Sequence, residues 1–168
     1  MKFNDLPSDF RLLIDTNKNN HLDAYNILEH LHTRGICLTF GRPASNLKSL
    51  LNVKGISTSS LIFIDCITKK IKGNQKLQDC YYANLDSFAE IFAAIDAASS
   101  EIQGRKFLIL DSLNELYLHH GYKSLIFLDF LNNMLVTHNS RAIFLTNSLK
   151  DEQMLNYIKQ KCDRTILL

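Results

Sequence analysis

Phe107-Leu-Ile-Leu-Asp111 is a run of four apolar residues that ends in a carboxylate. Leu61-Ile-Phe-Ile-Asp65 has the same form, and Ala142-Ile-Phe-Leu145 is a third unbroken apolar run. Runs that are apolar at every position, rather than at every second one, are typical of strands buried on both faces of a parallel sheet. Ligands of such sheets bind beyond the carboxyl ends of the strands, so Asp65 and Asp111 are expected at the edge where a ligand would lie.

Helical spacing of apolar residues follows most of these runs. Strands are expected at 10–14, 36–40, 61–65, 107–110, 142–145 and 165–168, with helices between them. Gly35 is expected to be the left-handed cap that ends the first helix. The stretch from Leu125 to Leu135 is apolar around so much of its circumference that we expect it to be largely buried. The pattern predicts an α/β fold, a three-layer α/β/α sandwich around a mostly parallel, Rossmann-like sheet.

Length and composition favour one globular domain. The 168 residues predict a single domain over 1–168, with an N-terminal extension at 1–9 and a basic loop at 68–80. A formal net charge of +2 lacks the basic excess typical of nucleic-acid-binding proteins. We expect no secretory signal and no membrane span. The four cysteines lack the spacing of a zinc site or a disulfide framework, which favours reduced thiols and a cytoplasmic protein.

The run ending in Asp111 resembles a Walker B strand, in which a buried strand holds a carboxylate at its tip for magnesium. The sequence segments around this run, in their order along the chain, resemble RecA-like ATPases of the KaiC type and archaeal KaiC-like proteins. The segments that carry the resemblance are 35–43, 56–65, 107–115, the apolar helix after Gly121, 141–146 and 164–168. The resemblance implies a RecA-like sheet of the P-loop NTPase type, with ATP and magnesium bound near Asp111.

Two elements of an ATPase of this type are missing from the sequence. A phosphate-binding loop needs GxxxxGK[ST] after the first strand, because glycines let backbone N–H groups turn toward the phosphates. Here that segment is Asp15-Thr-Asn-Lys-Asn-Asn-His21, which contains no glycine. Active KaiC-type enzymes carry a water-activating acidic residue after the second strand, where this chain has Gly41-Arg42.

These departures predict a pseudo-ATPase. We expect a non-catalytic RecA/KaiC-like domain that has lost ATP hydrolysis and acts as a protein-interaction or regulatory module. Its expected partner is another protein or a second copy of the chain, and no cofactor is expected. Asp111 would then serve only as a cap or turn residue for the helix that follows it.

A nucleotide or phosphorylated-ligand binding protein is the first alternative. Its atypical phosphate site would combine Lys18, Asn20, Arg42, Asp111 and Ser112, with ATP and magnesium as ligands and Asp111 as the metal ligand. Arg42 would bind an anion there or reach across a subunit interface as an arginine finger. The simpler expectation for Arg42 is an ion pair with a strand-end carboxylate, either Asp15 or Asp65.

A DNA-associated accessory protein of the recombinase type is the second alternative. Its support is a basic patch that would contact nucleic acid or an acidic partner, formed by Lys69, Lys70, Lys72 and Lys76. Such a run is more often a solvated loop, and the near-neutral net charge favours that interpretation.

Overall fold

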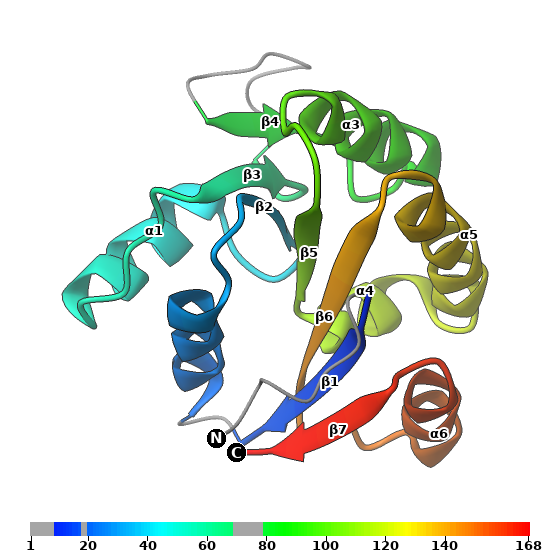
Figure 1. Cartoon of the computed structure of the whole chain (residues 1–168). Helices are drawn as coiled ribbons and strands as arrows, with labels where there is room; N and C mark the ends of the chain where they lie inside the picture. The colour runs from blue at the N-terminus through cyan, green and yellow to red at the C-terminus, as the bar shows by residue number, and fades with distance from the viewer. Residues whose placement is uncertain (1–8, 18–19, 69–78) are drawn as a thin grey trace.

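A computed structural model describes residues 9–17, 20–68 and 79–168 of the chain (Figure 1). The strands are β1 (Arg11–Thr16), β2 (Gly35–Thr39), β3 (Leu61–Asp65), β4 (Cys80–Tyr82), β5 (Lys106–Asp111), β6 (Ser140–Asn147) and β7 (Arg164–Leu167). The helices are η1 (His21–His30), α1 (Ala44–Val53), α3 (Phe88–Ser100), α4 (Leu113–His120), α5 (Lys123–Thr137) and α6 (Glu152–Gln160). The predicted strands and helices are confirmed, with ends that differ by one to a few residues.

The seven strands form one sheet in the order β4-β3-β2-β5-β6-β1-β7, and every neighbouring pair is parallel. Two apolar clusters cover its faces. One contains the buried side chains of α3, α4, α5 and α6, and the other contains those of η1 and α1. Figure 1 shows these two groups of helices on opposite sides of the strands. The three-layer α/β sandwich with a parallel sheet is therefore confirmed.

The first helix, η1, is a 3-10 helix of 10 residues, with hydrogen bonds from Asp23 N to Asn20 O and from Leu31 N to Leu28 O. It buries Ala24, Tyr25 and Ile27 against the sheet. The expectation of a helix after the first strand is confirmed, although its hydrogen bonds span three residues instead of four.

The prediction for Gly35 is wrong. Gly35 is the first residue of β2 and caps no helix, and Leu31 ends η1 in an extended conformation. A Cβ atom on Gly35 would lie 2.1 to 2.4 Å from three carbon atoms of the Phe107 ring. Glycine is required here because a neighbouring strand packs an aromatic ring against the backbone, which a local sequence pattern does not show.

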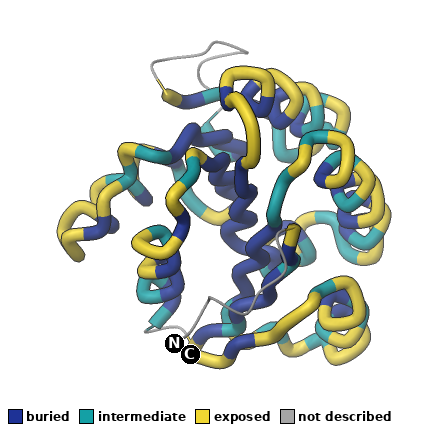
Figure 2. The backbone as a smooth tube through the Cα atoms, in the orientation of Figure 1, coloured by how far each residue is buried: buried dark blue, intermediate teal, exposed yellow. Residues whose placement is uncertain are grey.

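The expected burial of residues 125–135 holds for only one side of α5. Phe127, Leu128 and Leu131 face the sheet, but Ile126 is 55% exposed and Phe130 is 57% exposed. These residues are only partly buried because α5 is an outer helix with one side in contact with the sheet. Figure 2 shows its opposite side exposed. In the described parts of the chain, no helix is long and apolar enough to cross a membrane.

Parallel pairing brings the polar strand ends together at one edge of the sheet. Thr39 at the end of β2 lies opposite Asp65 on β3 and Asp111 on β5. On the other side of β5, Asp15 on β1 lies opposite Thr146 on β6. This edge is where the sequence predicts a ligand.

Candidate functional site

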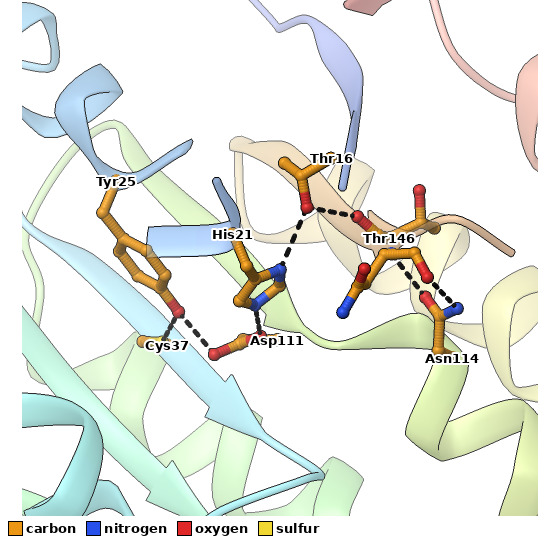
Figure 3. A network of polar contacts seen from close by, with 8 residues as sticks. Thr16, His21, Tyr25, Cys37, Asp111, Asn114 and Thr146 are labelled. Atoms are coloured by element: carbon orange, nitrogen blue, oxygen red, sulfur yellow. Dashed lines mark hydrogen bonds and ion pairs between the residues drawn. The ribbon is translucent and has the colours of Figure 1, made fainter. Parts of the chain in front are cut away.

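Asp111 is the centre of a buried polar cluster formed with residues from the start of η1. The Nε2 atom of His21 lies 2.5 Å from Asp111 Oδ1, and the hydroxyl of Tyr25 donates to Asp111 Oδ2 at 2.9 Å. Asp111 is 3% exposed and His21 is 6% exposed, so water has little access to either. The peptide bond between Asp111 and Ser112 is cis. Both carboxylate oxygens of Asp111 have a partner within the protein: His21 at Oδ1 and Tyr25 at Oδ2 (Figure 3).

The hydrogen bonds of Thr16 determine which ring nitrogen of His21 carries a proton. The Thr16 hydroxyl donates to the carbonyl of Thr146 at 3.0 Å, and its oxygen lies 3.3 Å from His21 Nδ1. A hydroxyl has one proton, so Thr16 accepts from His21, and Nδ1 must carry a hydrogen. Nε2 then faces Asp111 Oδ1, as in a buried imidazole–carboxylate pair (Figure 3).

Tyr25 and Cys37 complete the cluster on the other side of Asp111. The Tyr25 hydroxyl donates its one hydrogen bond to Asp111, so the Cys37 thiol donates to the Tyr25 oxygen at 3.5 Å. Burial, and secondly the charge of Asp111, raise the pKa of Tyr25 well above its usual value and raise the pKa of Cys37 strongly. Both groups stay protonated across the physiological range, so Cys37 is not an activated thiol.

The carboxylate of Asp65 organises the backbone around the start of α1. It accepts hydrogen bonds from Ala44 N at 2.9 Å, from Ile67 N at 2.9 Å and from both the backbone and the hydroxyl of Thr68. Asp15 accepts from the hydroxyl of Thr146 at 2.8 Å. These two strand-end carboxylates are thus used to hold the loops in place.

The structure describes four of the five residues proposed for an atypical phosphate site, namely Asn20, Arg42, Asp111 and Ser112. Asn20 precedes η1, where its carbonyl accepts from Asp23 N. Arg42 is half-buried after β2 and makes no hydrogen bond or ion pair with any described residue, so the expected pair with Asp15 or Asp65 is wrong. Ser112 is buried before α4 with no side-chain capping bond.

Lys18 and the basic patch of Lys69, Lys70, Lys72 and Lys76 lie outside the described residues. The predicted contact of these lysines with phosphate, nucleic acid or an acidic partner therefore stays a prediction.

The donor set around Asp111 does not fit a magnesium ion. Magnesium takes octahedral oxygen ligands and keeps several waters, whereas both oxygens of Asp111 face protein donors. Among the residues that the structure describes, no three His, Cys, Asp or Glu side chains group as metal ligands. The expectation that Asp111 caps the following helix is also wrong, because Ser112 occupies the N-cap position of α4.

A pocket of about 450 Å³ opens beside this cluster, between the start of α4 and the loop from β6 to α6. Ser112, Asn114 and Glu115 line one wall, and Asn147 and Lys150 line the other. Asn114 ties the walls together: its Nδ2 donates to Asn147 O at 2.9 Å, and its Oδ1 accepts from Asn147 N at 2.7 Å (Figure 3). The pocket lies at the carboxyl ends of β5 and β6, on the edge of the sheet where the sequence predicts a ligand.

His21 and Tyr25 are the polar residues of the Asp111 cluster that the sequence did not identify as its partners. His21 is 90 positions from Asp111, and no local motif connects the two. The available signal was the parallel sheet itself, since His21 follows the end of β1 and Asp111 ends β5.

The chain matches no protein-family model and no curated protein sequence. Solved structures, however, share its fold. A KaiC-like protein of Pyrococcus horikoshii superimposes with a TM-score of 0.68 at 16% identity, over 97% of this chain and 74% of the other.

An uncharacterized P. horikoshii protein, solved in complex with an unknown peptide, gives a TM-score of 0.72 at 11% identity, over 95% of this chain and 77% of that one. A third P. horikoshii protein gives 0.64 at 10% identity, covering 95% of this chain and 81% of its own length. At these identities the likeness shows the fold alone: the chain is an α/β protein with the fold of a KaiC-like protein.

Proposed function

We propose that the chain is a RecA/KaiC-type domain that does not hydrolyse ATP and instead acts as a protein-interaction or regulatory module. The observation that carries this proposal is the closure of Asp111 by His21 and Tyr25. Asp111, the carboxylate that resembles a Walker B residue, contacts His21 and Tyr25, which both lie in the segment that follows the first strand. In the ATPases that the sequence resembles, that position belongs to the phosphate-binding loop.

Two further observations support the loss of activity. The segment between β1 and η1 contains no glycine, so it lacks the residues that turn backbone N–H groups toward phosphates. Neither Asp15 nor Asp65 is available as a water-activating base, because both accept hydrogen bonds from the loops around them.

An interaction role is supported by what the surface exposes. Tyr122, Ile126 and Phe130 are each more than half exposed on the outward side of α5 and its start. Large apolar side chains gathered on one side of a helix are typical of interaction sites. A protein of the same fold was solved with a peptide bound. The four cysteines are free, which fits a reducing compartment such as the cytoplasm.

Thermal unfolding and ATP turnover test the proposal together. A ligand at about 100 times its dissociation constant adds roughly 2.7 kcal/mol, and each kcal/mol shifts a domain of this size by about 2–4 °C. We expect no shift in the melting temperature with millimolar magnesium-ATP and no phosphate release. Magnesium-dependent turnover that the Asp111→Asn variant abolishes would refute the proposal.

A further inference from the structure

Three polar groups that line the pocket between α4 and the β6–α6 loop lack a protein partner. The Oδ1 atom of Asn147 is buried and accepts no hydrogen bond from any described residue. Ser112 is 8% exposed, and its hydroxyl has no partner in the described parts of the chain. The exposed Glu115 carboxylate forms no ion pair with a described residue. Buried polar groups in folded proteins are nearly always paired, so the unpaired Oδ1 of Asn147 indicates a missing partner. Ser112 and Glu115 add two unpaired acceptors to the same lining.

The backbone of Asn147 is held in place by Asn114. Both backbone polar groups of Asn147 are held by the side chain of Asn114, at 2.7 and 2.9 Å (Figure 3). Asn114 lies in the first turn of α4, next to Glu115, so the same contact holds the two walls of the pocket at a set separation. A preformed site of this kind loses little free energy to ordering when a ligand enters.

The charges around the pocket favour a cation. Glu115 and Asp151 are negative, and Lys150 is the positive group of the lining. Asp151 accepts from the Tyr117 hydroxyl at 2.5 Å and from Met154 N at 2.8 Å. These hydrogen bonds lower the pKa of Asp151, so it stays ionised at neutral pH. The lining therefore carries a net charge of about −1.

We propose that this pocket binds the guanidinium group of an arginine on a partner protein, an inference that rests on the proposed role of the chain as an interaction module. The three unpaired groups can all accept hydrogen bonds, and a guanidinium offers five N–H donors and no acceptor. Its methylene groups would lie against the apolar part of the lining, which consists of Leu118, Leu149 and the ring of Tyr117.

A protein segment is favoured over a free small molecule because an apolar surface continues from the pocket. The ring of Tyr117 contacts that of Tyr122, edge to face, at 5.9 Å between centroids. Ile126 and Phe130 follow Tyr122 at intervals of four residues, which places them on the same side of α5. We name Tyr122, Ile126 and Phe130 the α5 ridge. Residues next to the bound arginine would cover this ridge, as apolar side chains of a docked helix do.

The pocket is tested with a pair of small probes, N-acetylarginine methylamide and its citrulline counterpart, which has nearly the same shape and no charge. Titration into the ¹⁵N-labelled chain is expected to shift the backbone amides of 112–115 and 147–151 with the arginine probe only. Glu115→Gln is expected to weaken this binding on the order of tenfold, the effect of one charge-assisted hydrogen bond. The matched control is Glu152→Gln, an exposed glutamate outside the pocket lining, which should leave the affinity unchanged.

The α5 ridge is tested with an amphipathic helical peptide that carries leucines and one arginine on the same side. We expect it to bind more tightly than the single amino-acid probe. Phe130→Gln should remove that gain and leave the binding of N-acetylarginine methylamide unchanged.

Three results would overturn the inference. These are equal binding of the citrulline probe, unchanged affinity in Glu115→Gln, and no saturable shift at probe concentrations on the order of 10 mM. A peptide that gains nothing over the single amino-acid probe would overturn the assignment to a protein segment. These titrations contain no nucleotide, so their failure is distinct from a failure of the ATP measurements.

Discussion

His21 Nε2 lies 2.5 Å from Asp111 Oδ1, although 90 residues separate the two side chains in the sequence. The contact joins the beginning of η1 to the tip of β5, which is two strands away from β1 in the sheet. Because both side chains are buried, we expect the pair to hold η1 over the edge of the sheet. We also expect it to prevent the Asp111 carboxylate from binding a ligand.

Replacing Asp111 should cost far more stability than replacing an exposed aspartate in an ion pair. Asp111→Ala leaves His21 and Tyr25 buried without their acceptor, and removal of one partner from a buried pair costs about 3–5 kcal/mol. Asp23→Ala breaks the exposed pair with Lys54 and should cost about 0–1 kcal/mol. Urea unfolding of both variants measures the difference. Equal losses would contradict a structural role for the buried pair.

Alkaline pH should destabilise the chain through its buried thiols. Burial raises the pKa of Cys37 and of Cys66, whereas unfolded thiols ionise near pH 8.5. Above that pH the unfolded chain binds fewer protons than the native one, so the free energy of unfolding falls as pH rises. Each thiol contributes a slope of up to about 1.4 kcal/mol per pH unit, and below pH 8.5 this contribution to stability is fully present.

The variant Cys37→Ala isolates one of these thiols. Its free energy of unfolding should fall less steeply between pH 8.5 and 10, by up to about 1.4 kcal/mol per pH unit. Ile36→Val also removes buried atoms from β2 but titrates nothing, so it should keep the wild-type slope. Chemical denaturation across this pH range provides the measurement, and an unchanged slope in Cys37→Ala would show that the thiol does not contribute.

The sequence predicted the fold because apolar runs and helical spacing are local signals. The run at 61–65 matches β3 residue for residue, and the runs at 107–110 and 142–145 lie within β5 and β6. The sequence failed where one residue depends on a distant one. Gly35 is explained by a ring on β5, and the state of Asp111 is decided by His21 and Tyr25. Strand order and side-chain approach determine such contacts, and neither has a local pattern.

Gly35 should be coupled energetically to Phe107. A Cβ atom on Gly35 would overlap the Phe107 ring, and overpacking of a core typically costs about 1–3 kcal/mol. The smaller side chain in Phe107→Leu should recover part of that loss in the double variant. Gly55 has a positive φ of 75°, and an added Cβ atom would have open space around it, so Gly55→Ala is strained without a clash. Its effect should add to that of Phe107→Leu within about 0.5 kcal/mol, whereas the Gly35 cycle should not be additive.

Asp65 should stabilise α1 more than it stabilises the distant part of the sheet. Its carboxylate accepts from Ala44 N at the start of α1 and from Thr68 beyond β3, and it is 2% exposed. Asp65→Ala leaves these donors unpaired, at a cost of about 1–3 kcal/mol. Asp96→Ala, which removes an exposed partner of His138, is the matched control and should cost about 0–1 kcal/mol.

Hydrogen exchange of the Asp65→Ala variant should show lost protection at Ala44 and through α1, with α6 affected only as far as global stability falls. Uniform loss across both helices would mean that Asp65 acts on the whole fold and not through the start of α1.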